Sequence, residues 1–183
     1  MRQLLMVMAV AGLALGMAGC GGGKVIARIE CGGTQEYVDQ TGAKWAADQE
    51  YTEAAKWGAM DGKTITRTTL KTIAGTQAPQ VYLTERYQMP GYRFDLPKGK
   101  YTVRLHFAET YEGITKVGER VFTVKVQGQP VLEDFDVMKA AGGFAKPVIK
   151  EFRGVAVTDG KLMIEFVPKV QNAEINGIEI LAD

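Results

Sequence analysis

Two carboxylates and an aromatic ring gather in one short stretch of this 183-residue chain. Glu109, Tyr111 and Glu112 stand just before Gly113 and follow a strongly alternating segment. A strand that delivers acidic and aromatic side chains to a glycine-bearing loop is a common way to present a binding surface. We therefore expect Tyr111, which lies beyond the end of the strand, to serve binding rather than core packing.

Carboxylate pairs raise the question of glycoside hydrolysis, which needs two carboxylates facing each other across a cleft. Glu109 with Glu112 and Asp134 with Asp136 are the pairs to consider, but nothing in the sequence places either pair in this way. The single histidine, His106, has no Ser or Cys in a nucleophile motif nearby, so a catalytic triad has no support. One His, no cysteine pair and no Asp-rich loop also argue against a metal site. We expect no catalytic residue, no metal and no cofactor.

Residues 101–108 are expected to form the strand that positions these loop side chains. Tyr101, Val103, Leu105 and Phe107 alternate with polar or small residues. This period of two is typical of a strand with one face in a core.

The rest of the chain reads as short strands separated by tight turns, with no helix of more than about two turns. The expected strands span 25–31, 65–73, 92–96, 101–108, 121–127, 130–137, 148–157, 162–167 and 175–181. Gly128-Gln129 predicts a two-residue type II′ turn, and Asp159-Gly160 predicts a hairpin between 148–157 and 162–167. A helical turn within 134–141 could end at Gly142-Gly143. This pattern predicts an all-β fold, an antiparallel β-sandwich of jelly-roll type.

Residues 34–62 lack a clean period and are expected to form a long loop, which in a compact domain is usually functional. Its two tryptophans could simply plug one end of the core. Both roles are also compatible, with Trp45 as the plug and Trp57 presented to a ligand.

Composition and charge narrow the classes of binding partner to be expected. The chain has 22 basic and 21 acidic residues, and without Arg2 of the leader described below the two signs balance. A nucleic-acid partner requires a basic face, so we expect none. Residues 24–183 show no repeat and no internal linker and are expected to form one domain.

The first 19 residues are expected to be a signal peptide, with Arg2 before an apolar stretch too short to span a membrane. Met17-Ala18-Gly19-Cys20 resembles the lipobox of bacterial lipoproteins. This implies cleavage before Cys20, lipidation of its thiol, and attachment to the bacterial cell envelope, with the outer membrane favoured where there are two. Residues 20–23 then form the lipidated cysteine and a glycine tether. The alternative is an ordinary secretory leader with an incidental cysteine.

Cys31 is the second cysteine, and a lipidated Cys20 leaves it without a disulfide partner. It shares one face of the first expected strand with Val25, Ala27 and Ile29. A buried thiol that acts as a small hydrophobe is expected here rather than a nucleophile.

Phe-Ala-Glu-Thr-Tyr at residues 107–111 closely resembles a signature of the malectin family of carbohydrate-binding domains. Six further segments resemble the family in the same order: 28–33, 39–48, 81–87, 118–122, 134–137 and 175–180. The resemblance implies a galactose-binding-like jelly roll that binds glucose-type di- or oligosaccharides without catalysis. It also implies glycan-degrading partner enzymes, because bacterial members usually stand beside glycosidases. An envelope lipoprotein that acts as a protein- or peptide-interaction or structural module is the alternative.

The resemblance and the loop chemistry place the ligand-binding site on three aromatics and three polar residues: Trp57, Tyr87, Tyr111, Glu112, Gln171 and Asn172. Aromatic rings can cover the apolar C–H face of a sugar, and carboxylates and amides can bond its hydroxyls. Glu112 replaces a family aromatic, and Gln171 or Asn172 replaces a family acid. Arg86 and Glu109 are expected to form a structural ion pair that joins two loops.

Overall fold

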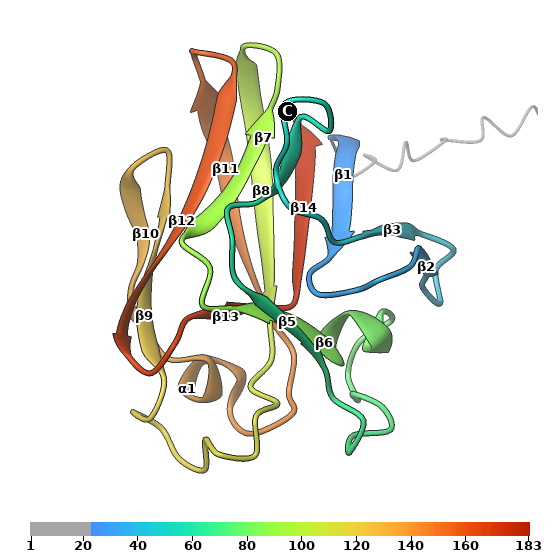
Figure 1. Cartoon of the computed structure of the whole chain (residues 1–183), viewed down its shortest axis with the longest axis vertical. Helices are drawn as coiled ribbons and strands as arrows, with labels where there is room; N and C mark the ends of the chain where they lie inside the picture. The colour runs from blue at the N-terminus through green and yellow to red at the C-terminus, as the bar shows by residue number, and fades with distance from the viewer. Residues whose placement is uncertain (1–22) are drawn as a thin grey trace, which may run out of the picture.

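The computed structural model describes residues 23–183, and strands dominate this range (Figure 1). The strands in chain order are β1 (Lys24–Glu30), β2 (Tyr37–Val38), β3 (Lys44–Ala47), β4 (Trp57–Ala59), β5 (Lys63–Thr66), β6 (Thr84–Tyr87), β7 (Gly91–Asp95), β8 (Gly99–Phe107), β9 (Val121–Val126), β10 (Gln129–Phe135), β11 (Val148–Val157), β12 (Lys161–Val170), β13 (Glu174–Ile175) and β14 (Gly177–Ala182). A 3-10 helix, η1 (Pro79–Tyr82), precedes β6, and an α-helix, α1 (Val137–Ala141), follows β10. The predicted signal peptide and lipidation residue Cys20 lie outside the described residues.

Two sheets stack to form the sandwich. The larger sheet has the order β11-β8-β14-β1-β3-β2, and the smaller has the order β10-β9-β12-β7-β4. Neighbouring strands are antiparallel except β1 and β3, which pair in parallel. The prediction of an all-β antiparallel sandwich is therefore confirmed.

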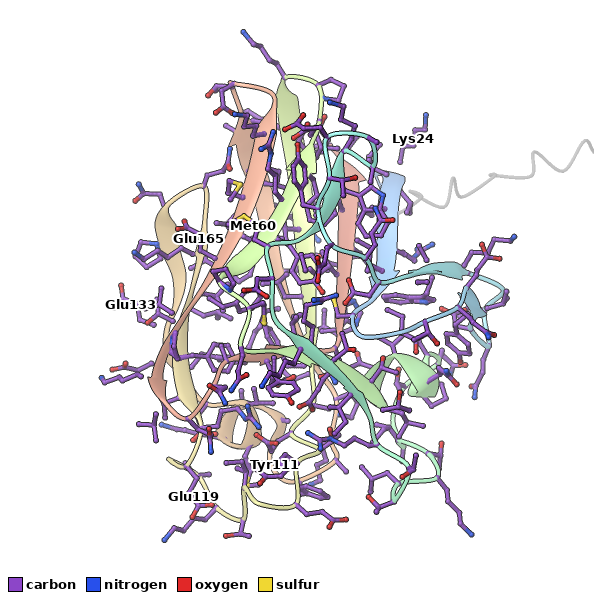
Figure 2. All side chains as sticks on the ribbon, viewed as in Figure 1. Lys24, Met60, Tyr111, Glu119, Glu133 and Glu165 are labelled. Atoms are coloured by element: carbon purple, nitrogen blue, oxygen red, sulfur yellow. The ribbon has the colours of Figure 1, made fainter. Side chains whose placement is uncertain are left out.

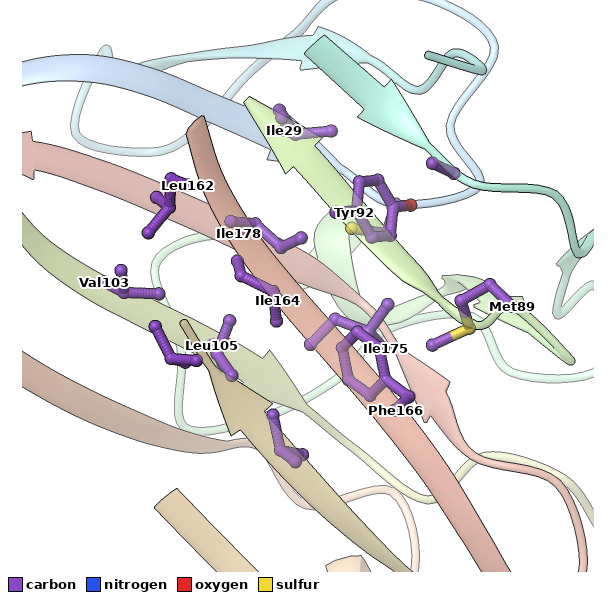
Figure 3. Packing of buried hydrophobic residues seen from close by; sticks show 14 of the residues in the cluster. Ile29, Met89, Tyr92, Val103, Leu105, Leu162, Ile164, Phe166, Ile175 and Ile178 are labelled. Carbon is purple, nitrogen blue, oxygen red and sulfur yellow. The ribbon is translucent and has the colours of Figure 1, made fainter. Parts of the chain in front are cut away.

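The main core lies between these sheets and is built on the predicted alternation of β8. Val103, Leu105 and Phe107 are each 0% exposed. Val103 and Leu105 belong to the same apolar cluster as Ile164 of β12 and Ile178 of β14 (Figure 3). Burial of this apolar area contributes the main favourable term in folding.

A second apolar cluster covers part of the outer face of the larger sheet. It contains Trp45 of β3, Tyr82 of η1 and Ala108, which directly follows β8. Trp45 is 3% exposed, and its Nε1 donates to Asp39 Oδ2 at 3.0 Å, so this tryptophan is buried, but in the second cluster rather than at an end of the main core. Cys31 is fully buried as predicted, and burial raises the pKa of its thiol.

A third sheet lies across one end of the sandwich, with the order β13-β6-β5 (Figure 1). Asn176, between β13 and β14, ties this sheet to the end of β8. Its Oδ1 accepts from the Ala108 amide at 2.6 Å, and its Nδ2 donates to the Thr84 carbonyl at 2.7 Å. These bonds place the start of β6 beside the end of β8, whereas Tyr87 lies at the opposite end of β6 and Tyr111 lies in the loop after β8.

Several local predictions need correction. The segment 34–62, expected to be a loop, contains β2, β3 and β4, while the expected strand at 65–73 is the shorter β5. Asp159-Gly160 does not close a hairpin, because β11 pairs with β8 in one sheet and β12 pairs with β7 and β9 in the other. A turn signal determines local geometry, whereas the choice of sheet depends on long-range pairing.

The turn between β9 and β10 is one residue earlier than predicted. Gln127 and Gly128 have φ of 54° and 74°, and Val126 pairs with Gln129. Positive φ at both central residues is the type I′ pattern, whose twist matches antiparallel strands. The predicted helical turn is confirmed as α1, which ends at Gly142 with φ of 75°. Within residues 23–183, no helix has the length and apolarity needed to cross a membrane.

Candidate functional site

A cavity of ≈ 240 Å³ opens where the third sheet meets the loops at one end of the sandwich. We call it the main cavity; it is lined by Ile65, Arg67, Glu85, Tyr87, Tyr111, Arg120, Gln171 and Asn172. Four of the six residues predicted to bind a ligand therefore lie together: Tyr87, Tyr111, Gln171 and Asn172.

The third sheet supplies the floor of the main cavity because of its strand alternation. Glu85 and Tyr87 are two residues apart in β6 and so share one face, while Arg86 points to the other. Ile65 lies opposite Glu85 in the pairing of β5 with β6. Glu174 lies opposite Tyr87 in the pairing of β13 with β6. The Tyr87 ring, the Ile65 side chain and the Glu85 carboxylate thereby lie side by side.

Tyr111 forms one wall of the main cavity, in the loop that follows β8 (Figure 2). Its side chain is 43% exposed, and the guanidinium carbon of Arg67 lies 5.3 Å from its ring centroid. A Cβ built on Gly113 would lie 2.5 Å from the Tyr111 ring, which is closer than atoms can approach. The glycine therefore makes room for the ring in its observed position.

A buried ion pair and a partly buried one support this wall and the floor. Arg120 Nε donates to Glu109 Oε2 at 2.6 Å, and Arg120 Nη1 donates to the Asn172 carbonyl at 2.7 Å. Arg67 Nη2 donates to Glu85 Oε1 at 2.6 Å. Glu109 also accepts from the Tyr111 amide at 3.0 Å, so the carboxylate orients the loop that carries the ring.

Glu174 is a further ionisable residue of this region. It is 0% exposed, and neither carboxyl oxygen has a hydrogen-bond partner among the residues that the structure describes. Burial raises the pKa of Glu174 well above its ordinary value, and the nearby negative charge of Glu85 raises it further. The raised pKa favours the neutral acid, which leaves Arg67 and Arg120 to balance Glu85 and Glu109.

The predicted Arg86–Glu109 ion pair is wrong. Arg86 lies on the face of β6 that turns away from the main cavity, where its Nε donates to Asp48 Oδ2 at 2.7 Å. Glu109 is instead bound to Arg120. Strand alternation separates neighbouring residues of β6 onto opposite faces, which places Arg86 out of reach of Glu109.

Trp57 does not join the site. It lies in β4 opposite Phe94 of β7, and the two rings stack with centroids 6.3 Å apart. Figure 2 shows Met60, just beyond β4, well removed from Tyr111. Glu112 does lie near the site, but it lines an adjoining hollow rather than the main cavity.

Four lining residues escaped the sequence-based prediction: Ile65, Arg67, Glu85 and Arg120. Glu85 could have been found, since the period of two places it on the face that carries Tyr87. Arg120 could also have been found, since it lies in segment 118–122, which resembles the malectin family. For Arg67 the sequence gives no such signal, because its contact with Tyr111 joins two distant loops.

Comparison with known proteins identifies a family and several relatives. The sequence model of the family described as Malectin domain matches residues 25–180. Receptor-like protein 4 of Arabidopsis thaliana is 31% identical over 169 residues, which cover 84% of this chain and 26% of that protein. A probable LRR receptor-like serine/threonine-protein kinase of the same plant is 33% identical over 162 residues, covering 79% of this chain and 16% of the kinase. The chain thus spans a minor part of these relatives.

Solved structures share the fold. A β-glucuronidase of Bacteroides uniformis matches with a TM-score of 0.77 and 24% identity, over 86% of this chain and 18% of that chain. A chain in the crystal structure of the plant peptide RALF23 in complex with FER and LLG2 matches with a TM-score of 0.71 and 26% identity. That match covers 86% of this chain and 48% of the other.

Proposed function

Because the chain belongs to the malectin domain family, we propose that its carbohydrate-binding site is the main cavity and that the ligand is a glucose-type di- or oligosaccharide. One observation carries the proposal. Tyr87 and Tyr111, from segments far apart in the sequence, converge on one cavity with the side chains of Gln171 and Asn172. Aromatic rings for the apolar face of a sugar and amides for its hydroxyls are the groups that such a ligand requires.

The charge balance of the cavity favours a neutral sugar. Arg67 is paired with Glu85, and Arg120 is paired with Glu109. With Glu174 in its neutral form, the floor offers no excess charge to a charged ligand. Hydroxyl groups can still use the remaining donor and acceptor capacity of these side chains.

The same pairing supports a non-catalytic role. A glycosidase needs one carboxylic acid and one free carboxylate across the scissile bond. Glu109 is held by Arg120, while Asp136 accepts from the Lys139 amide at the start of α1. Asp134 forms an exposed pair with Lys169. Three of the four carboxylates considered from the sequence thus have structural partners, so neither pair consists of two free carboxylates, and we propose that the domain binds without catalysis.

Tyr111→Ala should weaken sugar binding by about tenfold or more while leaving the melting temperature nearly unchanged. An aromatic contact contributes about 0.5–1.5 kcal/mol beyond burial, and about 1.4 kcal/mol corresponds to a factor of ten. Tyr111 is 43% exposed and belongs to neither apolar cluster, so its removal opens no core cavity. Calorimetric titration with maltose and nigerose, beside thermal melts, measures both quantities.

Tyr51→Ala is the matched control for this variant. Tyr51 also lies under an arginine, with Arg93 4.2 Å from its ring centroid, but it does not line the main cavity. Gly113→Ala provides a complementary test, because it displaces the Tyr111 ring without removing it. Wild-type affinity in both Tyr111→Ala and Gly113→Ala would mean that the binding site lies elsewhere.

A peptide or protein ligand is the second candidate, because a similar chain comes from the complex of the plant peptide RALF23 with FER and LLG2. A glycan array probed with the protein discriminates between the two. Glucose-containing hits that weaken in Tyr111→Ala support the first proposal. An array without hits favours the second.

We further propose that Cys20 anchors the protein to a bacterial envelope, where the domain would hold glycans near enzymes that degrade them. The support is the lipobox-like Met17-Ala18-Gly19-Cys20. Cells fed a labelled fatty acid should label the wild-type protein, whereas Cys20→Ala should incorporate no label and retain its leader. An unlabelled wild-type protein would refute the lipid anchor without affecting the sugar site.

A further inference from the structure

A second hollow adjoins the main cavity on the far side of Arg67 and Tyr111. Its volume is ≈ 220 Å³, and we call it the threonine hollow; it is lined by Ile65, Thr66, Arg67, Thr68, Thr69, Thr110, Tyr111 and Glu112. Ile65, Arg67 and Tyr111 also line the main cavity. The two hollows therefore meet at Arg67 and Tyr111, and we call the two together the groove.

We propose that the threonine hollow is an additional saccharide subsite, so that the groove prefers a neutral oligosaccharide longer than a disaccharide. The proposal rests on the function assigned above to the main cavity. Ligand sites usually have a volume of about 300 Å³ or more. Neither hollow reaches this size alone, whereas the two together do.

The lining of the threonine hollow fits the rim of a sugar. Hydroxyl groups of Thr66, Thr68 and Thr69 can each donate and accept hydrogen bonds, and all three residues are exposed. Glu112 adds a carboxylate that can accept hydrogen bonds from sugar hydroxyls. Ile65, which is 37% exposed, offers an apolar patch beside them. Short hydroxyls around an apolar patch suit a polyol rather than an extended apolar ligand.

Arg67 is the residue that connects the two hollows. Its Nη2 donates to Glu85 and its Nε to Thr110, at 2.6 and 3.4 Å. These bonds hold the guanidinium beside the Tyr111 ring. A guanidinium has five N–H donors, so among the described residues these two bonds leave three for a ligand. Arg67 can therefore donate to the sugars on either side of the junction.

Titration calorimetry on the full chain tests the proposal with maltose, maltotriose, maltotetraose and maltohexaose, and with nigerose and nigerotriose. Maltohexaose should bind about tenfold tighter than maltose, since each net hydrogen bond changes affinity about two- to tenfold. In the double variant Thr68→Val/Thr69→Val this advantage should disappear, while maltose affinity stays within about twofold of wild type. Valine keeps the β-branched shape and removes only the hydroxyls.

Thr64→Val is the matched control, because Thr64 belongs to the same strand as Ile65 but lies opposite Arg86, on the face turned away from the groove. It should retain the preference for longer chains. Equal affinity for maltose and maltohexaose, or a preference that survives in the double variant, would overturn the additional subsite while the main cavity still binds sugar. Failure of every sugar to bind would overturn the proposed function itself, and the subsite with it.

Discussion

Arg120→Ala should lower the free energy of unfolding by about 3–5 kcal/mol. The side chain is nearly inaccessible, and it binds the Glu109 carboxylate and the Asn172 carbonyl. Breaking a buried ion pair from one side costs about 3–5 kcal/mol, because it leaves an uncompensated buried charge. Here the abandoned charge is that of Glu109, which is 0% exposed. Urea unfolding, followed by tryptophan fluorescence, measures the loss directly.

An exposed ion pair provides the control for this prediction. Lys169 and Asp134 are paired at 2.8 Å, but their side chains are 62% and 61% exposed. Lys169→Ala should therefore cost less than about 1 kcal/mol. The double variant Arg120→Ala/Glu109→Ala should recover part of the stability lost in Arg120→Ala, since no charge remains unpaired. Equal unfolding midpoints for Arg120→Ala and wild type would show that the buried pair does not stabilise the fold.

The sandwich was predictable because strand periodicity is a local property of the sequence. The alternation from Tyr101 to Phe107 gave β8, and residues 148–157 gave β11 with the observed bounds. The pairing of strands was less predictable. Asp159-Gly160 carries a strong turn signal, yet the chain there passes from one sheet to the other. The place of β12 in the second sheet follows from its long-range pairing with β7 and β9, not from the turn.

The site was predictable to the extent that strand ends determine it. Tyr87 ends β6 and Tyr111 follows β8, so both were expected in or beside loops, and the structure brings them together at the main cavity. Trp57 was misplaced because its position depends on the pairing of β4 with β7, between segments about 35 residues apart. The short β4 has too little pattern to predict that pairing.

The pairing of the buried ionisable residues beneath the main cavity was equally hard to predict from the sequence. Three glutamates and two arginines come from five separate segments: Glu85, Glu109, Glu174, Arg67 and Arg120. The sequence gives their types, but their pairing depends on which faces of β6 and β13 turn toward the loop. The expected Arg86–Glu109 pair failed because it assigned Arg86 to the wrong face of β6. Strand alternation, applied from Tyr87, would have placed Glu85 rather than Arg86 on the face of β6 that turns toward the main cavity.

Phe107→Ala should also lower the free energy of unfolding by about 3–5 kcal/mol, but through lost packing rather than charge. Phe107 is 0% exposed, and its ring centroid lies 5.0 Å from that of Phe135 and 6.0 Å from that of Phe122. Truncating a buried phenylalanine removes transfer free energy and leaves a cavity that the core fills only in part. Thermal and urea unfolding should both register the loss.

Phe144→Ala is the control, because this ring is 37% exposed and a surface substitution usually changes stability by no more than about 0.5 kcal/mol. Phe107→Ala also contrasts with Tyr111→Ala, although the two rings are only four residues apart. At a temperature where Phe107→Ala remains folded, it should bind sugar as wild type does, since its ring faces the core and not the main cavity. A folded Phe107→Ala protein that has lost sugar affinity would show that the core and the site are coupled, and that the loop carrying Tyr111 is not held by Glu109 and Asn176 alone.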